Sequence, residues 1–153
     1  MALPNIFSKD VTDEIISRIN KLNKDTKPKW GKMSVSQMLA HCCVTYQYVY
    51  ESEKFNKPNL LMGWVLKSFV KKSVVNEIPY GHNIKTGPDF IIKGDRDFES
   101  EKQRLVEFLR RSQKDGEEYF SGKESFSFGK LNTNEWNNMF YKHMNHHLTQ
   151  FGV

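Results

Sequence analysis

Apolar residues recur at helical spacing through most of this 153-residue sequence. Residues 11–23 show the pattern clearly. Their apolar side chains stand three or four positions apart and share one face of a helix: Ile15, Ile16, Ile19 and Leu22. A helix with one apolar face must bury that face against other elements. The same spacing predicts further helices at about 34–53, 97–114 and 132–150, and a shorter helix after Pro58.

Two of these helices begin with a capping signal. Ser34 precedes Gln37 by three residues, and Asn132 precedes Glu135 by the same interval. In such a capping box each side chain binds the backbone N–H of the other residue, which satisfies donors at the start of the helix. The helix that starts near residue 97 is expected to stop at Gly116.

Two of the loops between the predicted helices stand out. Residues 77–95 contain two prolines and three glycines, and long loops of this kind often form the wall of a site. The "DFII" stretch within this loop suggests a brief extended piece, and "SGKESFSFGKL" forms the second loop. No sheet larger than a hairpin is expected. We therefore predict an all-α protein with a single domain over residues 1–153, built as a four-helix bundle with one additional short helix.

Charge and apolar content exclude two classes of partner. The net charge is +5, but the lysines are scattered among acids, which indicates solvated faces rather than a groove for nucleic acid. The longest apolar run, "LLMGWV" from Leu60, is far too short to span a membrane. We therefore expect neither a nucleic-acid partner nor a membrane partner.

The opening residues and the cysteines favour a cytoplasmic location. The stretch "MALPNIFSKD" lacks the basic start and the apolar run of a signal peptide. The two cysteines, Cys42 and Cys43, are neighbours, and adjacent cysteines rarely form a disulfide because the bridge would be strained. The sequence thus has no disulfide framework, as expected in a reducing compartment.

Three of the five histidines stand close together near the end of the sequence. At about 100° per residue, His143 and His147 fall within about 20° of Trp136, on the face of the last helix expected to point into the core. His146 lies roughly 80° away, on the flank. Two imidazoles one helical turn apart on an apolar face suit two ligands of one metal ion.

A third imidazole comes from the second predicted helix. His41 falls at the border of the inward face that Met38 and Thr45 define. Together, His41, His143 and His147 would form a three-nitrogen site with an open coordination position, which is typical of catalytic metal centres. Zinc, nickel, iron and manganese all accept nitrogen ligands, and the spacing does not choose among these divalent metals.

Simpler explanations exist for each of these residues. A single histidine is more often a hydrogen-bonded core residue, and a positive charge near the end of a helix is favourable in itself. His82 is expected at the surface. Cys42 is expected to be a small core residue. A thiolate metal site at "HCC" is disfavoured, because adjacent side chains on a helix diverge.

Two blocks around these histidines resemble the signature blocks of DinB-like proteins. They are "WGKMSVSQMLAHCCVTY", from Trp30 to Tyr46, and "FGKLNTNEWNNMFYKHMNHHLTQFGV", from Phe128 to Val153. The chain is most similar to a branch of that superfamily without an assigned function. The resemblance implies a four-helix bundle in which His41, His143 and His147 hold a divalent metal. Relatives with known activity use or transfer a low-molecular-weight thiol, and others resemble metal-dependent hydrolases or isomerases.

One position departs from the pattern of the relatives. Members of this branch often carry a His-Pro pair shortly before the "FGKL" segment, where this chain has Ser125 and Phe126. If that histidine contributes to catalysis in the relatives, its absence argues against activity in this chain.

Two functional hypotheses follow. In the first, the protein is a metal-dependent enzyme, a low-molecular-weight thiol S-transferase or a hydrolase. Gln37, Tyr46 and His146 would then lie beside the metal ligands, and no catalytic residue is assigned. In the second, it is a non-catalytic bundle that binds a metal or small ligand or acts through dimer contacts. A homodimer is compatible with both hypotheses, whereas an open metal position facing a solvent-reachable cavity would favour the first.

Overall fold

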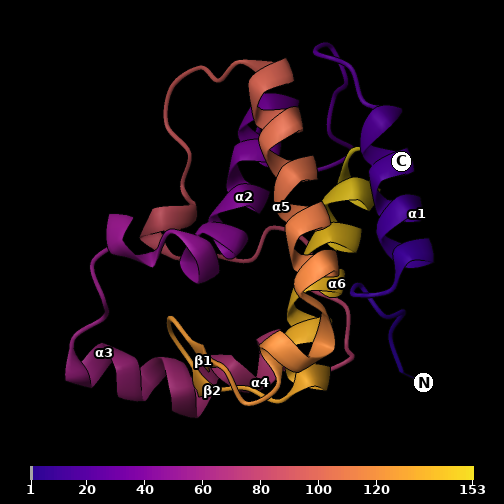
Figure 1. Ribbon diagram of the computed structural model, residues 1–153. Helices are drawn as coiled ribbons and strands as arrows, with labels where there is room; N and C mark the ends of the chain where they lie inside the picture. Colours follow the sequence, from indigo (N-terminus) through magenta and orange to yellow (C-terminus); the bar gives the residue numbers. More distant parts are fainter. Residues whose placement is uncertain (1) are drawn as a thin grey trace.

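The computed structural model describes residues 2–153, and it is mostly helical. Its longest helices are α1 (Lys9–Asn20), α2 (Val35–Tyr50), α5 (Phe98–Phe120) and α6 (Thr133–Gln150). Helices α5 and α6 each contact the other three, and the core lies between them (Figure 1). The predicted all-α class is therefore confirmed.

Shorter elements connect the long helices. After α2 come the 3-10 turn η1 (Ser52–Lys54), α3 (Leu60–Val65), the π-helical turn η2 (Leu66–Val70) and α4 (Lys71–Val75). The 3-10 turn η3 (Pro88–Phe90) precedes α5, and strands β1 (Glu124–Ser125) and β2 (Gly129–Lys130) form an antiparallel hairpin before α6. Over residues 2–153 no larger sheet is present, as predicted, and no helix is both long and apolar enough to cross a membrane.

Side-chain caps explain where all four long helices begin, and Asp97 caps α5 by accepting the backbone N–H of Ser100. The Ser8 hydroxyl accepts a backbone N–H of α1, so this helix begins slightly earlier than predicted. Both predicted capping boxes are present, Ser34 with Gln37 at α2 and Asn132 with Glu135 at α6. These boxes satisfy the first backbone donors of the two helices that carry the candidate histidines.

One prediction about the backbone holds and another holds only in part. The regular helix that starts at Phe98 is interrupted at Gly116, as predicted, and a further helical stretch within α5 follows the kink and ends at Phe120. Gly116 adopts φ 71° and ψ −179°, which kinks α5, and a positive φ of this kind costs glycine little. The stretch "DFII" begins in the turn η3, which the Phe90 N–H closes by donating to the Gly87 carbonyl at 3.1 Å, and its backbone becomes extended at Ile91.

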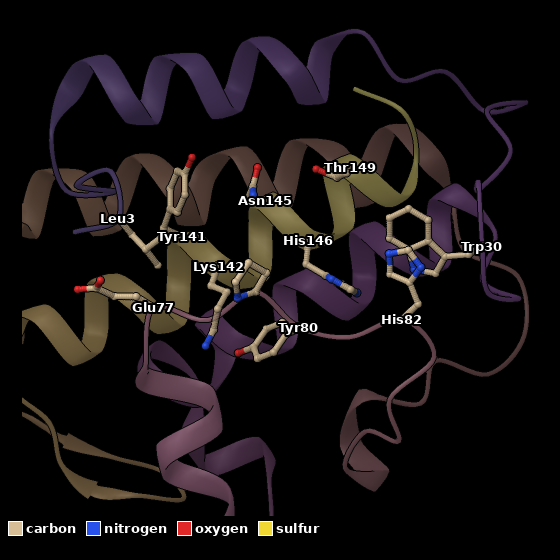
Figure 2. A pocket seen from close by; sticks show the side chains of 11 residues that line it. Leu3, Trp30, Glu77, Tyr80, His82, Tyr141, Lys142, Asn145, His146 and Thr149 are labelled. Atoms are coloured by element: carbon tan, nitrogen blue, oxygen red, sulfur yellow. The ribbon is translucent and has the colours of Figure 1, made fainter. Parts of the chain in front are cut away.

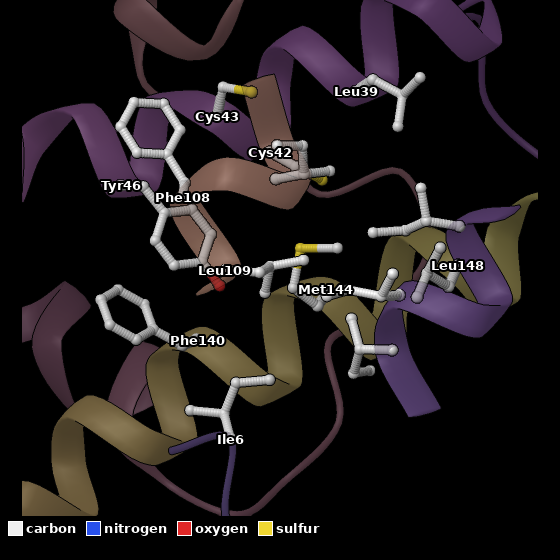
Figure 3. Packing of buried hydrophobic residues seen from close by; sticks show 14 of the residues in the cluster. Ile6, Leu39, Cys42, Cys43, Tyr46, Phe108, Leu109, Phe140, Met144 and Leu148 are labelled. Carbon is white, nitrogen blue, oxygen red and sulfur yellow. The ribbon is translucent and has the colours of Figure 1, made fainter. Parts of the chain in front are cut away.

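Aromatic rings fill the centre of the core. Tyr46 from α2 stacks on Phe140 from α6 with ring centroids 4.8 Å apart (Figure 3). Phe7, just before α1, stacks on Phe120 at the same distance of 4.8 Å. Complete burial of side chains of this size stabilises a fold by roughly 1.5–3 kcal/mol each. This packing holds α2 against α6 and so positions the residues described next.

Candidate metal centre

Three imidazole rings converge where α2 faces α6. His41 lies on α2, and His143 and His147 lie one turn apart on α6. The ring centroids are 5.0 Å apart for His41 and His143, 4.6 Å for His41 and His147, and 4.8 Å for His143 and His147. One nitrogen of each ring lies within 4.8 Å of the others. The structure therefore brings the three predicted histidines close enough together to hold a metal ion.

The regular geometry of α6 explains why two of these rings face inward. His143 and His147 follow Trp136 and Phe140 on one stripe of the helix, and those two aromatic side chains are only 1% and 0% exposed. Burying this stripe in the core turns both imidazoles toward α2. His41 meets them there because α2 packs against the same side of α6.

The Nε2 atoms of His41 and His143 lie 3.0 Å apart. Two unprotonated nitrogens at this distance repel each other, so the contact requires either a proton or a cation between them. In a tetrahedral zinc site with Zn–N distances of about 2.0–2.1 Å, two nitrogen ligands lie about 3.3 Å apart. The spacing of the two Nε2 atoms is therefore close to that of two ligands of one ion.

A backbone carbonyl fixes the tautomer of His41. The Nδ1 atom of His41 lies 2.8 Å from the carbonyl oxygen of Phe90. A carbonyl oxygen only accepts hydrogen bonds, so Nδ1 carries the proton and the Nε2 lone pair is left free for a cation. The Phe90 ring also packs against the imidazole, with centroids 5.3 Å apart, so η3 covers this side of the site.

A glutamine at the end of α6 fixes the tautomer of His147 in the same way. The Gln150 side chain donates from Nε2 to the Trp30 carbonyl at 2.8 Å, which turns its Oε1 toward Nδ1 of His147, also at 2.8 Å. Since Oε1 only accepts, Nδ1 of His147 carries the proton and Nε2 is free. The segment before α2 thus orients a histidine on the last helix.

The third ring has a partner of a different kind. Nδ1 of His143 lies 3.0 Å from the hydroxyl oxygen of Thr45, which is one turn beyond His41 on α2. A hydroxyl can either donate to Nδ1 or accept from it. When it accepts, Nε2 of His143 is also free, and all three rings offer Nε2 to one position.

Burial keeps the three imidazoles neutral near neutral pH. Burial lowers the pKa of His41, and it lowers the pKa of His143 well below its ordinary value with the help of His147 and His41. For His147, burial and then the neighbouring His41 lower the pKa to about 3. Neutral imidazole is the form that binds metal ions, so the surroundings of these rings suit ligation.

The family described as "Protein of unknown function (DUF1569)" matches residues 7–152. The chain belongs to this family. The matched region of this DUF1569 protein contains the three histidines and every group that hydrogen-bonds to them. No curated protein and no solved structure is significantly similar to the chain. Because the family description names no activity, the function must be argued from the geometry.

Gln37 and Tyr46, two of the predicted neighbours of the ligands, have different surroundings in the DUF1569 fold. Gln37 is one turn before His41, and its Nε2 donates to the Gly94 carbonyl at 3.1 Å, which ties the loop before α5 to α2. Tyr46 lies in the aromatic centre of the core instead, stacked on Phe140. Its buried hydroxyl has no hydrogen-bond partner among the described residues.

His146, the third predicted neighbour, lies beside the cluster but faces another surface. Its ring centroid is 5.0 Å from that of His147, while Trp30 and Tyr80 lie at 5.8 and 5.7 Å. His146, Trp30 and Tyr80 line a cavity of about 160 Å³ beside α6 (Figure 2). His82 is exposed, as predicted, and stacks on Trp30 at this cavity with ring centroids 3.8 Å apart.

The two cysteines are not part of the cluster. Burial raises the pKa of Cys42 well above its ordinary value and raises the pKa of Cys43 to about 12. Both thiols therefore stay protonated at neutral pH, whereas metals bind the thiolate. Cys42 is a buried core residue, as predicted, and the "HCC" stretch contributes its histidine alone.

The sequence analysis missed the groups that orient the imidazoles. Gln150 follows His147 by three residues on a helix, a spacing at which side chains meet, so that signal was present. Thr45 was placed on the inward face of α2 without a role. The carbonyl of Phe90 belongs to the backbone, and no residue pattern indicates which backbone oxygen will reach His41.

Proposed function

We propose that this DUF1569 protein is a metal-dependent protein of the DinB-like type, in which Nε2 of His41, His143 and His147 bind one divalent ion. One observation carries the proposal. Each ring has its Nδ1 atom hydrogen-bonded to the protein, which leaves Nε2 for the shared position. Histidines that bind metals show this arrangement, because the second hydrogen bond fixes the tautomer and the direction of the ring.

The arrangement of helices supports the same proposal. The ligands come from the second and the last of the four long helices, which are the positions that the DinB-like resemblance implies. The contacts of α5 and α6 with the other long helices are those expected of a four-helix bundle. A DinB-like bundle is accordingly part of the proposal.

The reaction class that we propose is transfer or hydrolysis involving a low-molecular-weight thiol. Three nitrogen ligands leave at least one coordination position for a small molecule. When bound, the ion would supply Lewis acidity, which favours the deprotonated form of a thiol or of water at neutral pH. Zinc, nickel, iron and manganese all suit three imidazoles.

The loop over residues 77–97 would form the wall of the substrate site. Phe90 in this loop packs against His143 with ring centroids 6.1 Å apart. The neighbouring Asp89 accepts a hydrogen bond of 2.7 Å from the Tyr48 hydroxyl, which fastens the turn η3 to α2. A substrate would therefore approach the ion beside Phe90, and this turn would decide which molecules fit.

Burial of the cluster favours a second candidate, a non-catalytic bundle with an enclosed ion. The residues His41 and His147 are only 5% and 7% exposed. An ion that is closed off from solvent has a structural role rather than a catalytic one. The serine that replaces histidine before "FGKL" points the same way, because the Ser125 hydroxyl donates to the Gly129 carbonyl at 2.9 Å and closes the hairpin.

Elemental analysis of protein purified without chelator or histidine tag tests the metal. We expect about one divalent ion per chain in wild type, near none in His143→Ala, and a wild-type amount in His82→Ala, since His82 is exposed and outside the cluster. Adding the ion should also stabilise the fold, by about 2.7 kcal/mol at a concentration 100 times Kd. Protein that holds no ion and whose unfolding midpoint ignores all four metals would refute the proposal.

Cobalt substitution separates the two candidates. The visible spectrum of bound cobalt reports changes in its ligands, so a small anion such as azide can probe the open position. A spectral change on addition of azide would support the catalytic candidate. Retained cobalt with an unchanged spectrum would support the enclosed ion of the second candidate instead.

A further inference from the structure

The segment from α3 to α4 exposes large apolar side chains. Leu60, Leu61, Met62, Trp64 and Phe69 are 96%, 73%, 50%, 59% and 68% exposed. These five residues are called the α3 apolar face below. No residue of α3, η2 or α4 is buried. A group of large apolar side chains in water indicates a surface that meets a partner.

The π-helical turn η2 brings the two aromatic residues of this face together. Bonding in a π-turn runs between residues five apart, so a residue five positions along returns to nearly the same side. Trp64 and Phe69 are five apart, and their rings meet edge to face with centroids at 5.6 Å. A regular α-helix would bring Ser68 beside Trp64 instead. The turn therefore extends the apolar face along the segment.

Hydrogen bonds to α6 hold one end of the segment in place. The Asn138 side chain donates to the Val75 carbonyl at 2.9 Å, and the Lys142 amino group donates to the carbonyls of Ser73 and Asn76 at 2.8 Å each. The other end, α3, lies away from the long helices at the edge of the molecule (Figure 1). The apolar face is thus presented on a fixed helical arm.

The charge of the segment identifies the chemistry of the partner. The segment contains no acidic residue and three lysines, Lys67, Lys71 and Lys72, and Lys54 and Lys57 shortly precede it. Lys54 pairs with Glu51, and Lys71 pairs with Glu135. The remaining three make no ion pair within residues 2–153 and are exposed. A partner that covers the apolar face must therefore be anionic to complement this charge.

We propose that the α3 apolar face and its lysines bind the surface of an anionic lipid bilayer. A short helix with Trp and Leu on its apolar side and lysines nearby lies in the headgroup region without spanning the membrane. The sequence analysis excluded a membrane partner because no segment could span, and a segment that lies on the surface escapes that criterion.

Two other partners fit the same surface less well. Nucleic-acid bases bind by stacking on aromatic rings, whereas Leu60, Leu61 and Met62 are aliphatic and suit acyl chains. A symmetric contact between two copies would place two basic segments against each other, which is repulsive. The mixture of aliphatic, aromatic and basic side chains is therefore best matched by anionic lipid.

Vesicle flotation tests the proposal with the full chain. We expect wild type to float with vesicles of phosphatidylglycerol and phosphatidylcholine, to stay behind with phosphatidylcholine alone, and to be released by high salt. The double variant Trp64→Ser with Phe69→Ser should lose flotation, and so should Lys67→Glu with Lys72→Glu. Ile84→Ser is the matched control, because Ile84 is 64% exposed but outside the segment.

Fluorescence locates the contact at one residue. Trp64 is exposed, whereas Trp30 is partly buried and Trp136 is buried. Anionic vesicles should shift the emission of wild type to shorter wavelength as Trp64 enters the headgroup region. Trp64→Phe should float as wild type does but show no shift, because the reporter is gone while the apolar ring remains.

Several outcomes would overturn the proposal. Equal flotation of wild type and the Trp64→Ser, Phe69→Ser variant would show that the apolar face does not contact the vesicles. If only the lysine variant loses flotation, the lysines form a general surface for polyanions. A wild-type dimer that becomes a monomer in the double variant, with no flotation by either, would make a second copy the partner. Far-ultraviolet circular dichroism should show equal helix content in every variant, since the changed side chains are exposed.

Discussion

Nε2 of His41 and Nε2 of His143 lie 3.0 Å apart across the contact between α2 and α6. His41 keeps its proton on Nδ1 for the Phe90 carbonyl, so in metal-free protein the proton between the two Nε2 atoms belongs to His143. The Thr45 hydroxyl must then donate to Nδ1 of His143. When a cation replaces that proton, Nδ1 takes the proton and Thr45 accepts. A hydroxyl at this position serves both states.

Thr45→Val should therefore weaken metal binding while keeping the shape of the side chain. We expect a loss of about 10–100-fold in affinity, the usual effect of removing a group that orients a metal ligand. Thr45→Ser retains a hydroxyl and should bind nearly as wild type. Competition with a chelator of known affinity measures the difference. Equal affinities for the valine variant and wild type would show that Thr45 does not position His143.

The helical phase of α6 predicts different effects for adjacent histidines. His143→Ala or His147→Ala should abolish stoichiometric metal, whereas His146→Ala should largely retain it, because His146 faces the cavity beside Trp30 and Tyr80. Elemental analysis after dialysis gives the metal content of each variant. If His146→Ala loses the metal and His147→Ala keeps it, the ligands on α6 are the pair three residues apart.

Gly31→Ala should weaken metal binding without changing a ligand. Gly31 has φ +84°, and a β-carbon there would lie 2.6 Å from Nε2 of Gln150. Displacing the Gln150 amide releases His147, so we expect about a tenfold loss of affinity. The positive φ adds a cost of roughly 1 kcal/mol in stability.

Gly122→Ala is the matched control for this effect. Its φ of +71° imposes the same backbone strain, but a β-carbon there meets nothing within 4 Å. It should lose stability and keep the metal affinity of wild type. Equal loss of affinity in Gly31→Ala and Gly122→Ala would attribute the effect to general destabilisation.

Acid should destabilise the metal-free protein. Burial lowers the pKa of His147 to about 3 in the folded chain, whereas an unfolded histidine has a pKa of about 6.5. Between these values the unfolded chain binds more protons than the folded chain. The contribution of His147 to the free energy of unfolding is therefore fully present above about pH 6.5, and it is lost as the pH drops toward about 3. Urea unfolding with chelator present, at a series of pH values, measures this slope. His147→Gln should flatten it, and an unchanged slope would assign the effect to other groups.

Tyr46→Phe should leave the metal content unchanged and the stability equal or slightly higher. The Tyr46 hydroxyl is buried without a partner in the described residues, a condition that costs about 1–3 kcal/mol. Tyr50→Phe is the comparison, because the Tyr50 hydroxyl donates to Asp115 at 2.8 Å and its loss should cost up to ~1 kcal/mol. Thermal unfolding separates the two. Loss of metal in Tyr46→Phe would assign that hydroxyl to the site.

The histidine cluster could be predicted because helical phase is a local property. Capping signals at Ser34 and Asn132 predict where α2 and α6 begin, and the apolar stripe then predicts which way His143 and His147 face. His41 followed from the same argument on α2. Both helices are regular where it matters, so a constant rotation per residue holds through all three positions.

Features that depend on irregular backbone could not be predicted in this way. The Trp64–Phe69 contact arises from a π-turn, which breaks the period on which the prediction rests. The short helical stretch after Gly116 has a similar origin, since the positive φ of Gly116 interrupts the helix and turns the chain before helical backbone resumes. The oxygen that orients His41 belongs to a loop whose path depends on tertiary contacts such as that between Gln37 and Gly94.

The close approach of Gly31 to Gln150 has an evolutionary consequence. A β-carbon at the first position would force the glutamine amide at the second to shift away from His147, so a change at one residue alters what is favourable at the other. Across the DUF1569 family, sequences that keep this glutamine should keep glycine before the second long helix. Sequences that have replaced the glycine should carry a shorter residue at the glutamine position, and in those lineages a different acceptor must hold the last histidine.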